Sequence, residues 1–139
     1  MSMRDLLKLH LSNAGYCVSL AEDALVAGRR ILSWTPDLML VDVHLPYMNG
    51  AELVATMLAD GTIPYIPVIF ITSDEGFAPN AELFDADVII KPFSRDRLLA
   101  CVARNMQKHE RMRERTADAH AQGARQSAYK PGSSKLESR

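Results

Sequence analysis

Long hydrophobic runs, paired cysteines and aromatic residues are all scarce in this chain of 139 residues. No apolar stretch approaches the roughly 20 residues of a membrane-spanning helix, and the first residues, Met1 to Arg4, lack the apolar centre of a secretory signal. The only two cysteines, Cys17 and Cys101, have no spacing typical of a disulfide or a metal site, so we expect both to be buried thiols. These absences predict a cytoplasmic protein.

The composition is that of one globular domain followed by a tail of different charge. Hydrophobic residues make up 47% of the chain and charged residues 24%, which is typical of a protein with a single core. Residues 1–106 carry 8 basic and 13 acidic side chains, whereas residues 107–139 carry 8 basic and 4 acidic ones. We therefore predict a domain over 1–106 and, over 107–139, a helical extension with a disordered basic tail. Nucleic-acid binding is not indicated, because the basic residues of the tail are mixed with glutamates and no recognition motif accompanies them.

Three short aliphatic segments each end in a side chain that can do chemistry. Segments this short, bounded by turn residues, are typical of buried strands in a parallel sheet. They are 38–41 followed by Asp42, 68–71 followed by Thr72, and 88–90 followed by Lys91. Because parallel strands end at the same edge of a sheet, a carboxylate, a hydroxyl and an ammonium should meet there.

Helical patterns alternate with these strands. We expect helices at 4–14, 22–34, 51–59 and from Ser94 to about residue 115, a further strand at 16–20, and at most a turn or two of helix at 79–84. Apolar stripes predict that Leu25, Ile31, Leu32 and Leu58 are buried on the inner faces of their helices. The alternation predicts an α/β fold, a doubly wound parallel sheet with right-handed crossovers.

Asp42, Thr72 and Lys91 together suit phosphoryl transfer. A strand-end carboxylate can attack phosphorus, bind a metal ion, or do both, and the transfer requires neutralisation of negative charge on the phosphoryl oxygens. Lys91 would supply an ammonium and Thr72 a hydroxyl, with Mg²⁺ as the usual third partner. The helix that begins at Asn49-Gly50 would add positive potential nearby. Taken singly, each residue is more commonly a cap or a surface residue, and it is the joint spacing that favours a functional site.

Further motifs surround these three residues. They are Pro46 and Gly50 four and eight positions after Asp42, Ile71-Thr72-Ser73 at a strand end, Lys91-Pro92-Phe93, Pro36-Asp37 and Gly15-Tyr16. Together they are specific, and across residues 3–106 the sequence resembles the receiver domain of two-component response regulators. The resemblance implies a flavodoxin-like fold in which Asp42 accepts a phosphoryl group from a histidine kinase or phosphotransfer protein. It also implies Thr72 as a switch hydroxyl, Lys91 as the ion-pair partner of the phosphoryl group, and the His44 main-chain carbonyl as a Mg²⁺ ligand beside Asp42.

The sequence departs from this family at its start. The family normally begins with a hydrophobic strand that ends in a Mg²⁺-binding acidic pair, whereas Met1 to Arg4 already resemble the start of the first helix. The missing strand would lie between the strands at 16–20 and 38–42, and its absence would leave a gap of about 9.6 Å with unpaired backbone groups. Either the chain is N-terminally truncated, or these two strands pair with each other, or a second chain fills the gap. With Asp42 as the remaining carboxylate, we expect weak or absent Mg²⁺-dependent phosphorylation.

Two other functions are open. Thr72 and Lys91 are 19 positions apart, a short interval for this family, and Val88 replaces the aromatic residue that usually precedes the lysine by three. A pseudo-receiver that acts by protein–protein contact, as a homodimer, is therefore an alternative to a phosphorylated receiver. An enzyme is disfavoured, because an aspartate-nucleophile phosphatase needs a second aspartate two residues after the nucleophile, where this chain has His44.

Overall fold

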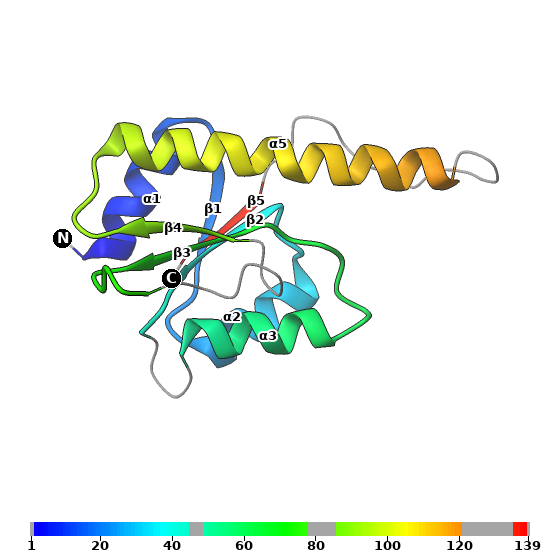
Figure 1. The fold of residues 1–139 in the computed structure, drawn as a ribbon, viewed down its shortest axis with the longest axis horizontal. Coiled ribbons are helices and arrows are strands. Elements are labelled where there is room, and N and C mark those ends of the chain that lie inside the picture. The colour runs from blue at the N-terminus through cyan, green and yellow to red at the C-terminus, as the bar shows by residue number, and fades with distance from the viewer. Residues whose placement is uncertain (1, 45–48, 78–85, 121–134, 139) are drawn as a thin grey trace.

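The computed structural model describes residues 2–44, 49–77, 86–120 and 135–138, in which helices and strands alternate (Figure 1). The elements are α1 (Met3–Asn13), β1 (Cys17–Leu20), α2 (Ala24–Ser33), β2 (Leu38–Asp42), α3 (Gly50–Ala59), β3 (Val68–Thr72), β4 (Asp87–Ile90), α5 (Arg95–His120) and β5 (Lys135–Ser138). The helical turns expected at 79–84 lie outside the described residues. None of the described helices combines the length and the apolarity that crossing a membrane requires.

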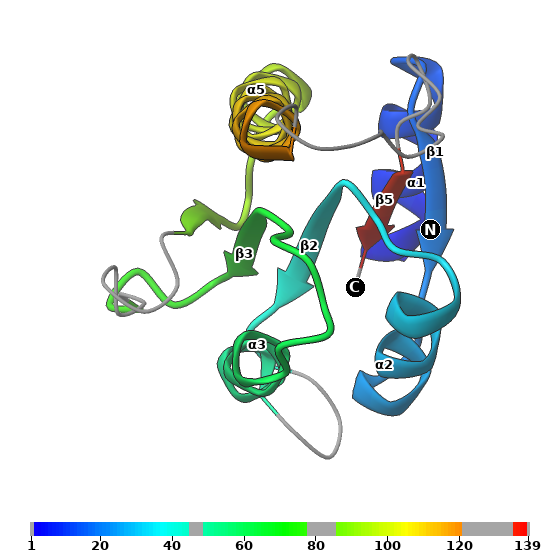
Figure 2. The ribbon, with the colours of Figure 1, turned by 90° about the vertical axis from the view of Figure 1, so that its right-hand side faces the viewer.

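The strands form one parallel sheet in the order β1-β5-β2-β3-β4. Helices α1 and α5 cover one face, and α2 and α3 cover the other (Figures 1 and 2). Each face buries its own apolar cluster: Leu7 and Val102 pack with Ile69 on the first side, and Val54 packs with Phe70 on the second. The predicted α/β flavodoxin-like fold with a long C-terminal helix is confirmed.

The position between β1 and β2 is filled by the C-terminal segment of the same chain. Strand β5 pairs in parallel with both neighbours, and Leu136 lies opposite Val18 on one side and Leu38 on the other. A sheet with a vacant central position would leave two rows of backbone N–H and C=O groups unpaired, which is costly when they are buried. The structure therefore differs from the expectation of a disordered tail at residues 135–138. It also differs from two of the alternatives for the gap, direct pairing of the two strands and a strand from a second chain, because β5 comes from the chain itself; N-terminal truncation stays a prediction.

The described helices begin at side chains that accept a backbone N–H from three residues further on. The capping residues are Ser2 for α1, Asp23 for α2, Asn49 for α3 and Ser94 for α5. Each cap satisfies one of the N–H groups that a first helical turn leaves without a partner. The cap expected at Ser94 is confirmed, and its Oγ accepts the N–H of Arg97 at 3.1 Å.

Several large side chains are exposed, although the apolar stripes of the sequence predict that they are buried. Leu25 and Leu32 are 66% and 69% exposed, because α2 packs on the sheet through a stripe of smaller residues that includes Ala24 and Ala27. Each leucine follows a residue of that stripe by one position, which turns it by about 100° away from the sheet. Leu58 and Cys17 are also exposed, so the burial predicted for them is wrong, whereas the burial of Ile31 and Cys101 is confirmed.

Candidate functional site

The end of β2 brings Asp42 to the side chain of a residue 49 positions further along the chain. The Lys91 ammonium, just after β4, lies 3.1 Å from Asp42 Oδ2. The two side chains are 27% and 23% exposed, for Lys91 and Asp42 respectively, so solvent and a partner can still reach the pair. The peptide bond between Lys91 and Pro92 is cis. The carboxylate and the ammonium predicted from the sequence thus meet at the carboxyl edge of the sheet.

The second oxygen of the Asp42 carboxylate is held by the backbone. Asp42 Oδ1 accepts a hydrogen bond from the His44 N–H at 2.9 Å. The strand continues its pairing just beyond the aspartate, since the Val43 N–H donates to the Ile71 carbonyl at 3.1 Å. Both carboxylate oxygens therefore have a donor, and the side chain is fixed at the edge rather than free to rotate.

Thr72 ends β3 next to this pair, but its hydroxyl faces a different partner. Its side chain is fully buried, and its Oγ1 accepts the Asp74 N–H at 3.0 Å. Its main-chain carbonyl accepts the Lys91 N–H at 2.7 Å, which joins the ends of β3 and β4. The three predicted residues thus lie on neighbouring strand ends, and among them the side-chain contact that the structure records joins Asp42 and Lys91.

Gly50, the first residue of α3, packs directly against the backbone of the aspartate. A Cβ at this position would overlap the Asp42 carbonyl oxygen and would lie 2.7 Å from the Cγ1 of Val41. The Gly50 N–H donates to the Val43 carbonyl at 2.8 Å, so the start of the helix is tied to the end of the strand. The motif marked Gly50 in the sequence, but the steric reason for a glycine appears only in three dimensions.

The described residues do not form a set of ligands that fits Mg²⁺. No group of three or more His, Cys, Asp or Glu side chains in the described part of the chain is placed to hold a metal ion. Asp74, in the loop after Thr72, directs its Oδ1 to the Gly76 N–H at 2.9 Å. Mg²⁺ prefers six oxygen ligands in octahedral geometry, and Asp42 is the carboxylate that this edge supplies. The role expected for the His44 carbonyl stays a prediction.

A second polar cluster, at the opposite end of the sheet, was not anticipated from the sequence. Asp87 Oδ2 accepts hydrogen bonds from Asn105 Nδ2 at 2.7 Å and from Arg104 Nη2 at 3.1 Å. Burial raises the pKa of Asp87, but the hydrogen bonds from Asn105 and Arg104 outweigh it, so the pKa lies below its ordinary value. Burial, followed by the charge of Asp87, raises the pKa of the adjacent Cys101 thiol. These contacts fasten α5 to the start of β4, and we interpret the cluster as structural.

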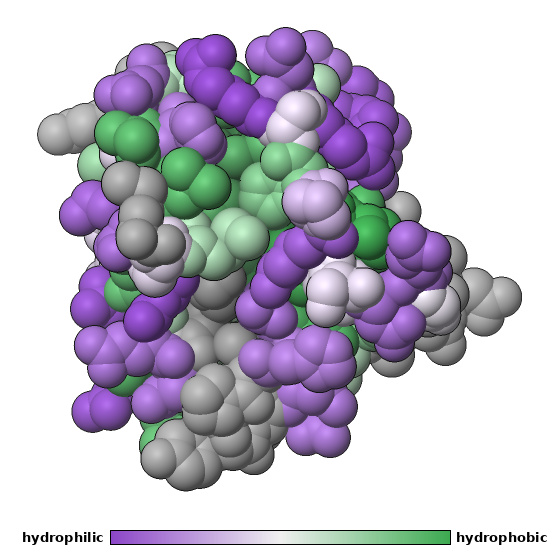
Figure 3. All heavy atoms as spheres, turned by 90° about the vertical axis from the view of Figure 1, so that its left-hand side faces the viewer, coloured by the Kyte–Doolittle hydropathy of each residue, from purple (hydrophilic) through white to green (hydrophobic). Residues whose placement is uncertain are grey.

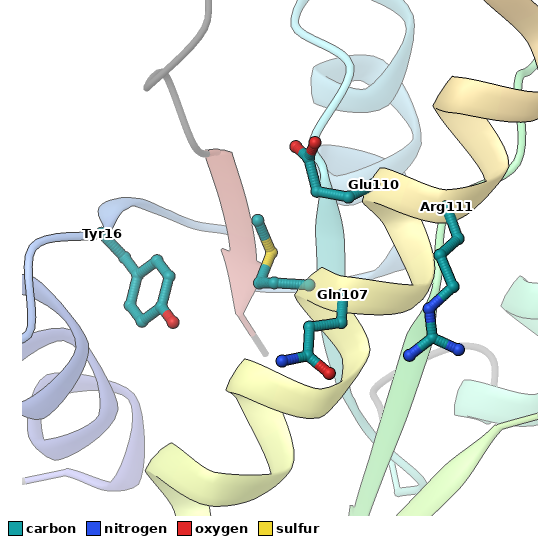
Figure 4. Close-up of a pocket in the computed structure, with 5 residues that line it drawn as sticks. Tyr16, Gln107, Glu110 and Arg111 are labelled. Carbon is teal, nitrogen blue, oxygen red and sulfur yellow. The ribbon is translucent and has the colours of Figure 1, made fainter.

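A shallow groove opens beside β5, also away from Asp42. Its volume is about 570 Å³, and it is lined by Tyr16, Met106, Gln107, Glu110 and Arg111. Figure 4 shows Tyr16 on one side of β5 and the labelled residues of α5 on the other. The groove is open to solvent and contains none of the predicted site residues.

The carboxyl edge itself carries an apolar patch between charged surroundings. Figure 3 faces the end of the molecule at which β3 and β4 terminate, and apolar side chains gather there among hydrophilic ones. Phe93 and Met3 are partly buried and pack on the core cluster of this side. This end of the molecule is therefore not uniformly polar.

Comparisons with known proteins place this arrangement in a family. Residues 1–103 match the family model described as the response regulator receiver domain. The chain is 32% identical over 102 residues to the response regulator MprA of Mycobacterium tuberculosis, covering 71% of this chain and 44% of that protein. It spans less than half the length of the curated relatives it matches.

The solved structures that this chain resembles include a receiver domain. The signal receiver domain of an HD domain-containing protein from Pseudomonas fluorescens is similar with a TM-score of 0.72 and 26% identity, covering 80% of this chain and 83% of that one. NtrX from Brucella abortus is similar with a TM-score of 0.74 and 26% identity, covering 88% of this chain and 29% of that one.

Proposed function

Because this chain belongs to the family of response regulator receiver domains of two-component systems, we propose that it accepts a phosphoryl group on Asp42 in a phosphorelay. The donor would be a phosphohistidine on a histidine kinase or phosphotransfer protein. The chain would act in the cytoplasm, as a signalling acceptor rather than as an enzyme with a substrate of its own.

The observation that carries this proposal is the ion pair between Asp42 and Lys91. An oxygen of the Asp42 carboxylate attacks the phosphorus, the P–N bond of the phosphohistidine breaks, and the electron pair of that bond stays on the imidazole nitrogen. The incoming phosphoryl group adds negative charge beside an ammonium that already lies 3.1 Å from the carboxylate. A preorganised charge of this kind stabilises a phosphoryl transfer more than a mobile one, because it needs no reorganisation during the reaction.

Thr72 would report the phosphorylated state. Its hydroxyl now accepts the Asp74 N–H within the adjacent loop, and it could instead donate to a phosphoryl oxygen on Asp42. Such a change would release the Asp74 amide and alter the loop after β3. Lys91 would at the same time transfer its contact from the carboxylate to the phosphoryl group.

We propose that Mg²⁺ is bound weakly here and that phosphorylation is correspondingly slow. The edge of the sheet supplies one carboxylate, and both of its oxygens already accept hydrogen bonds. Mg²⁺ would have to compete with these donors and with its own hydration shell, which it gives up reluctantly.

The proposal is tested by treatment with acetyl phosphate over a range of Mg²⁺ concentrations, followed by intact-mass measurement. We expect partial addition of one phosphoryl group, which is lost in Asp42→Asn and retained in Asp60→Asn, a matched change in a loop aspartate after α3. Rapid stoichiometric addition would contradict weak Mg²⁺ binding while supporting Asp42 as acceptor. No addition at any Mg²⁺ concentration, or equal addition to Asp42→Asn, would overturn the assignment of the acceptor.

The second candidate function is a pseudo-receiver that acts by protein–protein contact, as a homodimer. The observation that favours it is the full engagement of the Asp42 carboxylate, with no set of metal ligands around it among the described residues. Light scattering distinguishes the two, because this function requires a dimer at working concentration whether or not acetyl phosphate is present. A monomer that is labelled on Asp42 would exclude it.

A further inference from the structure

The loop after β3 is held by two separate contacts to that strand. Near its start, the Asp74 N–H donates to the Thr72 hydroxyl at 3.0 Å. Further along, the ring of Phe77 lies edge-on against the ring of Phe70, with 5.5 Å between the centroids and 66° between the planes. Phe70 and Thr72 are two positions apart in β3, so their side chains lie on the same face of the sheet. The two contacts therefore fasten one loop to one face of the strand.

The residues between these two contacts form a turn with its own hydrogen bonds. The Asp74 carbonyl accepts the Phe77 N–H at 3.1 Å, and the Asp74 carboxylate accepts the Gly76 N–H at 2.9 Å. Both bonds are typical of a β-turn that begins with an aspartate. Asp74 thus contacts the Thr72 hydroxyl through its N–H and the backbone of Phe77 through its carbonyl. We therefore expect residues 74–77 to move as one unit, so that a displacement at Thr72 is passed on to Phe77.

The ring of Phe77 also belongs to the apolar interior. It is partly buried and packs against the cluster between the sheet and helices α2 and α3. Strands β3 and β4 lie side by side (Figure 1), and Phe70 is in register with Val88, which packs against the same cluster. If the turn moved away, apolar surface would be exposed to water. An edge-to-face aromatic contact alone favours the packed form by about fivefold.

We propose that the contact between Phe77 and Phe70 is autoinhibitory: it keeps the turn at 74–77 on the Thr72 hydroxyl and so opposes phosphorylation of Asp42. The inference rests on the proposed function, in which this hydroxyl turns to a phosphoryl oxygen and releases the turn. The turn can leave only when its ring leaves the strand. Phe77 is thus a positioning residue that acts on the site through Thr72, and it restrains the site rather than assists it.

The coupling has to act in both directions. If the aromatic contact disfavours the phosphorylated form by a given factor, phosphorylation disfavours the aromatic contact by the same factor. Removal of the ring should therefore favour phosphorylation, which is the opposite of the effect expected when a residue that supports the site is lost.

The test compares Phe77→Ala with Ile63→Ala in the full chain. Ile63 packs against the same apolar cluster but lies in the loop after α3, so its truncation controls for lost burial. Phe77→Leu keeps apolar volume without the edge-on ring, and it keeps the test decisive if the alanine variant folds poorly. Intact mass gives the phosphorylated fraction at a low, fixed concentration of acetyl phosphate. Hydrogen exchange of the Asp74 amide is measured without acetyl phosphate.

We expect Phe77→Ala to raise the phosphorylated fraction about fivefold, because the form in which Thr72 is released from the turn becomes more populated. The Asp74 amide should exchange about fivefold faster in the same variant. Phe77→Leu should show both changes to a smaller extent, and Ile63→Ala should show neither. In a Thr72→Val background, Phe77→Ala should not raise the phosphorylated fraction further, because the ring acts through the hydroxyl.

Several outcomes would overturn the proposal while leaving Asp42 as the acceptor. They are an unchanged or lower phosphorylated fraction in both Phe77 variants, an equal rise in Ile63→Ala, and a full rise that persists in the Thr72→Val background. Unchanged exchange of the Asp74 amide would also overturn it, because the ring would then not hold the turn.

Failure of the proposed function has a different signature. In that case no variant gains the mass of a phosphoryl group, or Asp42→Asn gains as much as the unchanged chain. The autoinhibitory role would then fall with the proposed function, whatever the exchange of the Asp74 amide.

Discussion

Gly50 and Asp42 are in direct backbone contact, and no side chain fits between them. A Cβ at residue 50 would overlap the Asp42 carbonyl oxygen, and the N–H of Gly50 donates to the carbonyl of Val43. The start of α3 is thereby held against the strand end that presents the carboxylate. The position of Asp42 thus depends on a residue that carries no functional group.

Replacement of Gly50 by alanine should therefore disturb the site as well as the fold. The added methyl group overlaps backbone, which cannot move away as a flexible side chain can, and we expect a loss of about 1–3 kcal/mol of unfolding free energy. Urea denaturation measures it, and chemical shifts of the Asp42 and His44 amides report the displacement.

The chain offers a matched control. Gly28 lies within α2, and a Cβ added to it would meet no atom within 4 Å beyond its chain neighbours and the backbone of its own helix. Alanine at residue 28 should stabilise the helix by about 0.5–1 kcal/mol. Equal effects of the two substitutions would contradict the close contact at Gly50.

Lys91→Met should separate the roles of the ion pair in stability and in chemistry. Because both partners are partly exposed, loss of the pair should cost less than about 1 kcal/mol of unfolding free energy. The rate of Asp42 labelling by acetyl phosphate should fall by about a hundredfold, since one preorganised positive charge is lost from the transition state.

Lys8→Met, which removes an exposed lysine on α1, is the control and should change neither quantity. A large loss of stability with an unchanged labelling rate in Lys91→Met would make the lysine a structural residue only.

Thr72→Val should loosen the loop that follows β3. Valine has nearly the same shape but cannot accept the Asp74 N–H, and loss of one such hydrogen bond costs about 1 kcal/mol. Hydrogen exchange of the Asp74 amide should therefore accelerate by about fivefold. Thr72→Ser keeps the hydroxyl and should leave this amide protected, so similar exchange in both variants would disagree with the structure.

The lowered pKa of Asp87 predicts that the folded chain loses stability in acid. Burial raises its pKa, but the hydrogen bonds from Asn105 and Arg104 outweigh that effect, so the folded pKa lies below the ordinary value of 3.8. A carboxyl with a lowered folded pKa stabilises the fold at neutral pH, and this contribution is lost as the pH falls below 3.8 through the folded pKa. Asp87→Asn should therefore lose less stability than the unmodified chain over this acid range.

Urea denaturation at a series of acid pH values measures the difference. Asn105→Ala removes a donor to Asp87 and should also flatten the pH dependence, because the pKa of Asp87 then rises toward its ordinary value. An unchanged slope in Asp87→Asn would show that this aspartate is not the group that responds.

The sequence predicted the elements that local patterns encode. The short aliphatic runs before Asp42, Thr72 and Lys91 are typical of buried parallel strands, and parallel strands necessarily end at one edge. The cap at Ser94 likewise follows from a hydrogen bond between residues three positions apart. These features depend on neighbours in the chain, so the order of residues is enough to predict them.

Packing against the rest of the chain decided what the sequence could not. Leu25 and Leu32 are larger than Ala24 and Ala27, yet the alanines face the sheet. Small residues let α2 approach the sheet closely. The surface on which a helix packs decides which of its faces is buried. The contact of Gly50 with Asp42 and the Asp87 cluster join residues far apart in sequence.

The strand Lys135–Ser138 is the clearest case. Its polar sequence carries no strand signal of its own, and the vacancy between β1 and β2 is what gives it a place. The sequence by itself determined which strands bring a carboxylate and an ammonium to the edge of the sheet. The tertiary structure alone decided how the sheet closes, because unpaired backbone groups in its interior have to be satisfied by whichever segment can reach them.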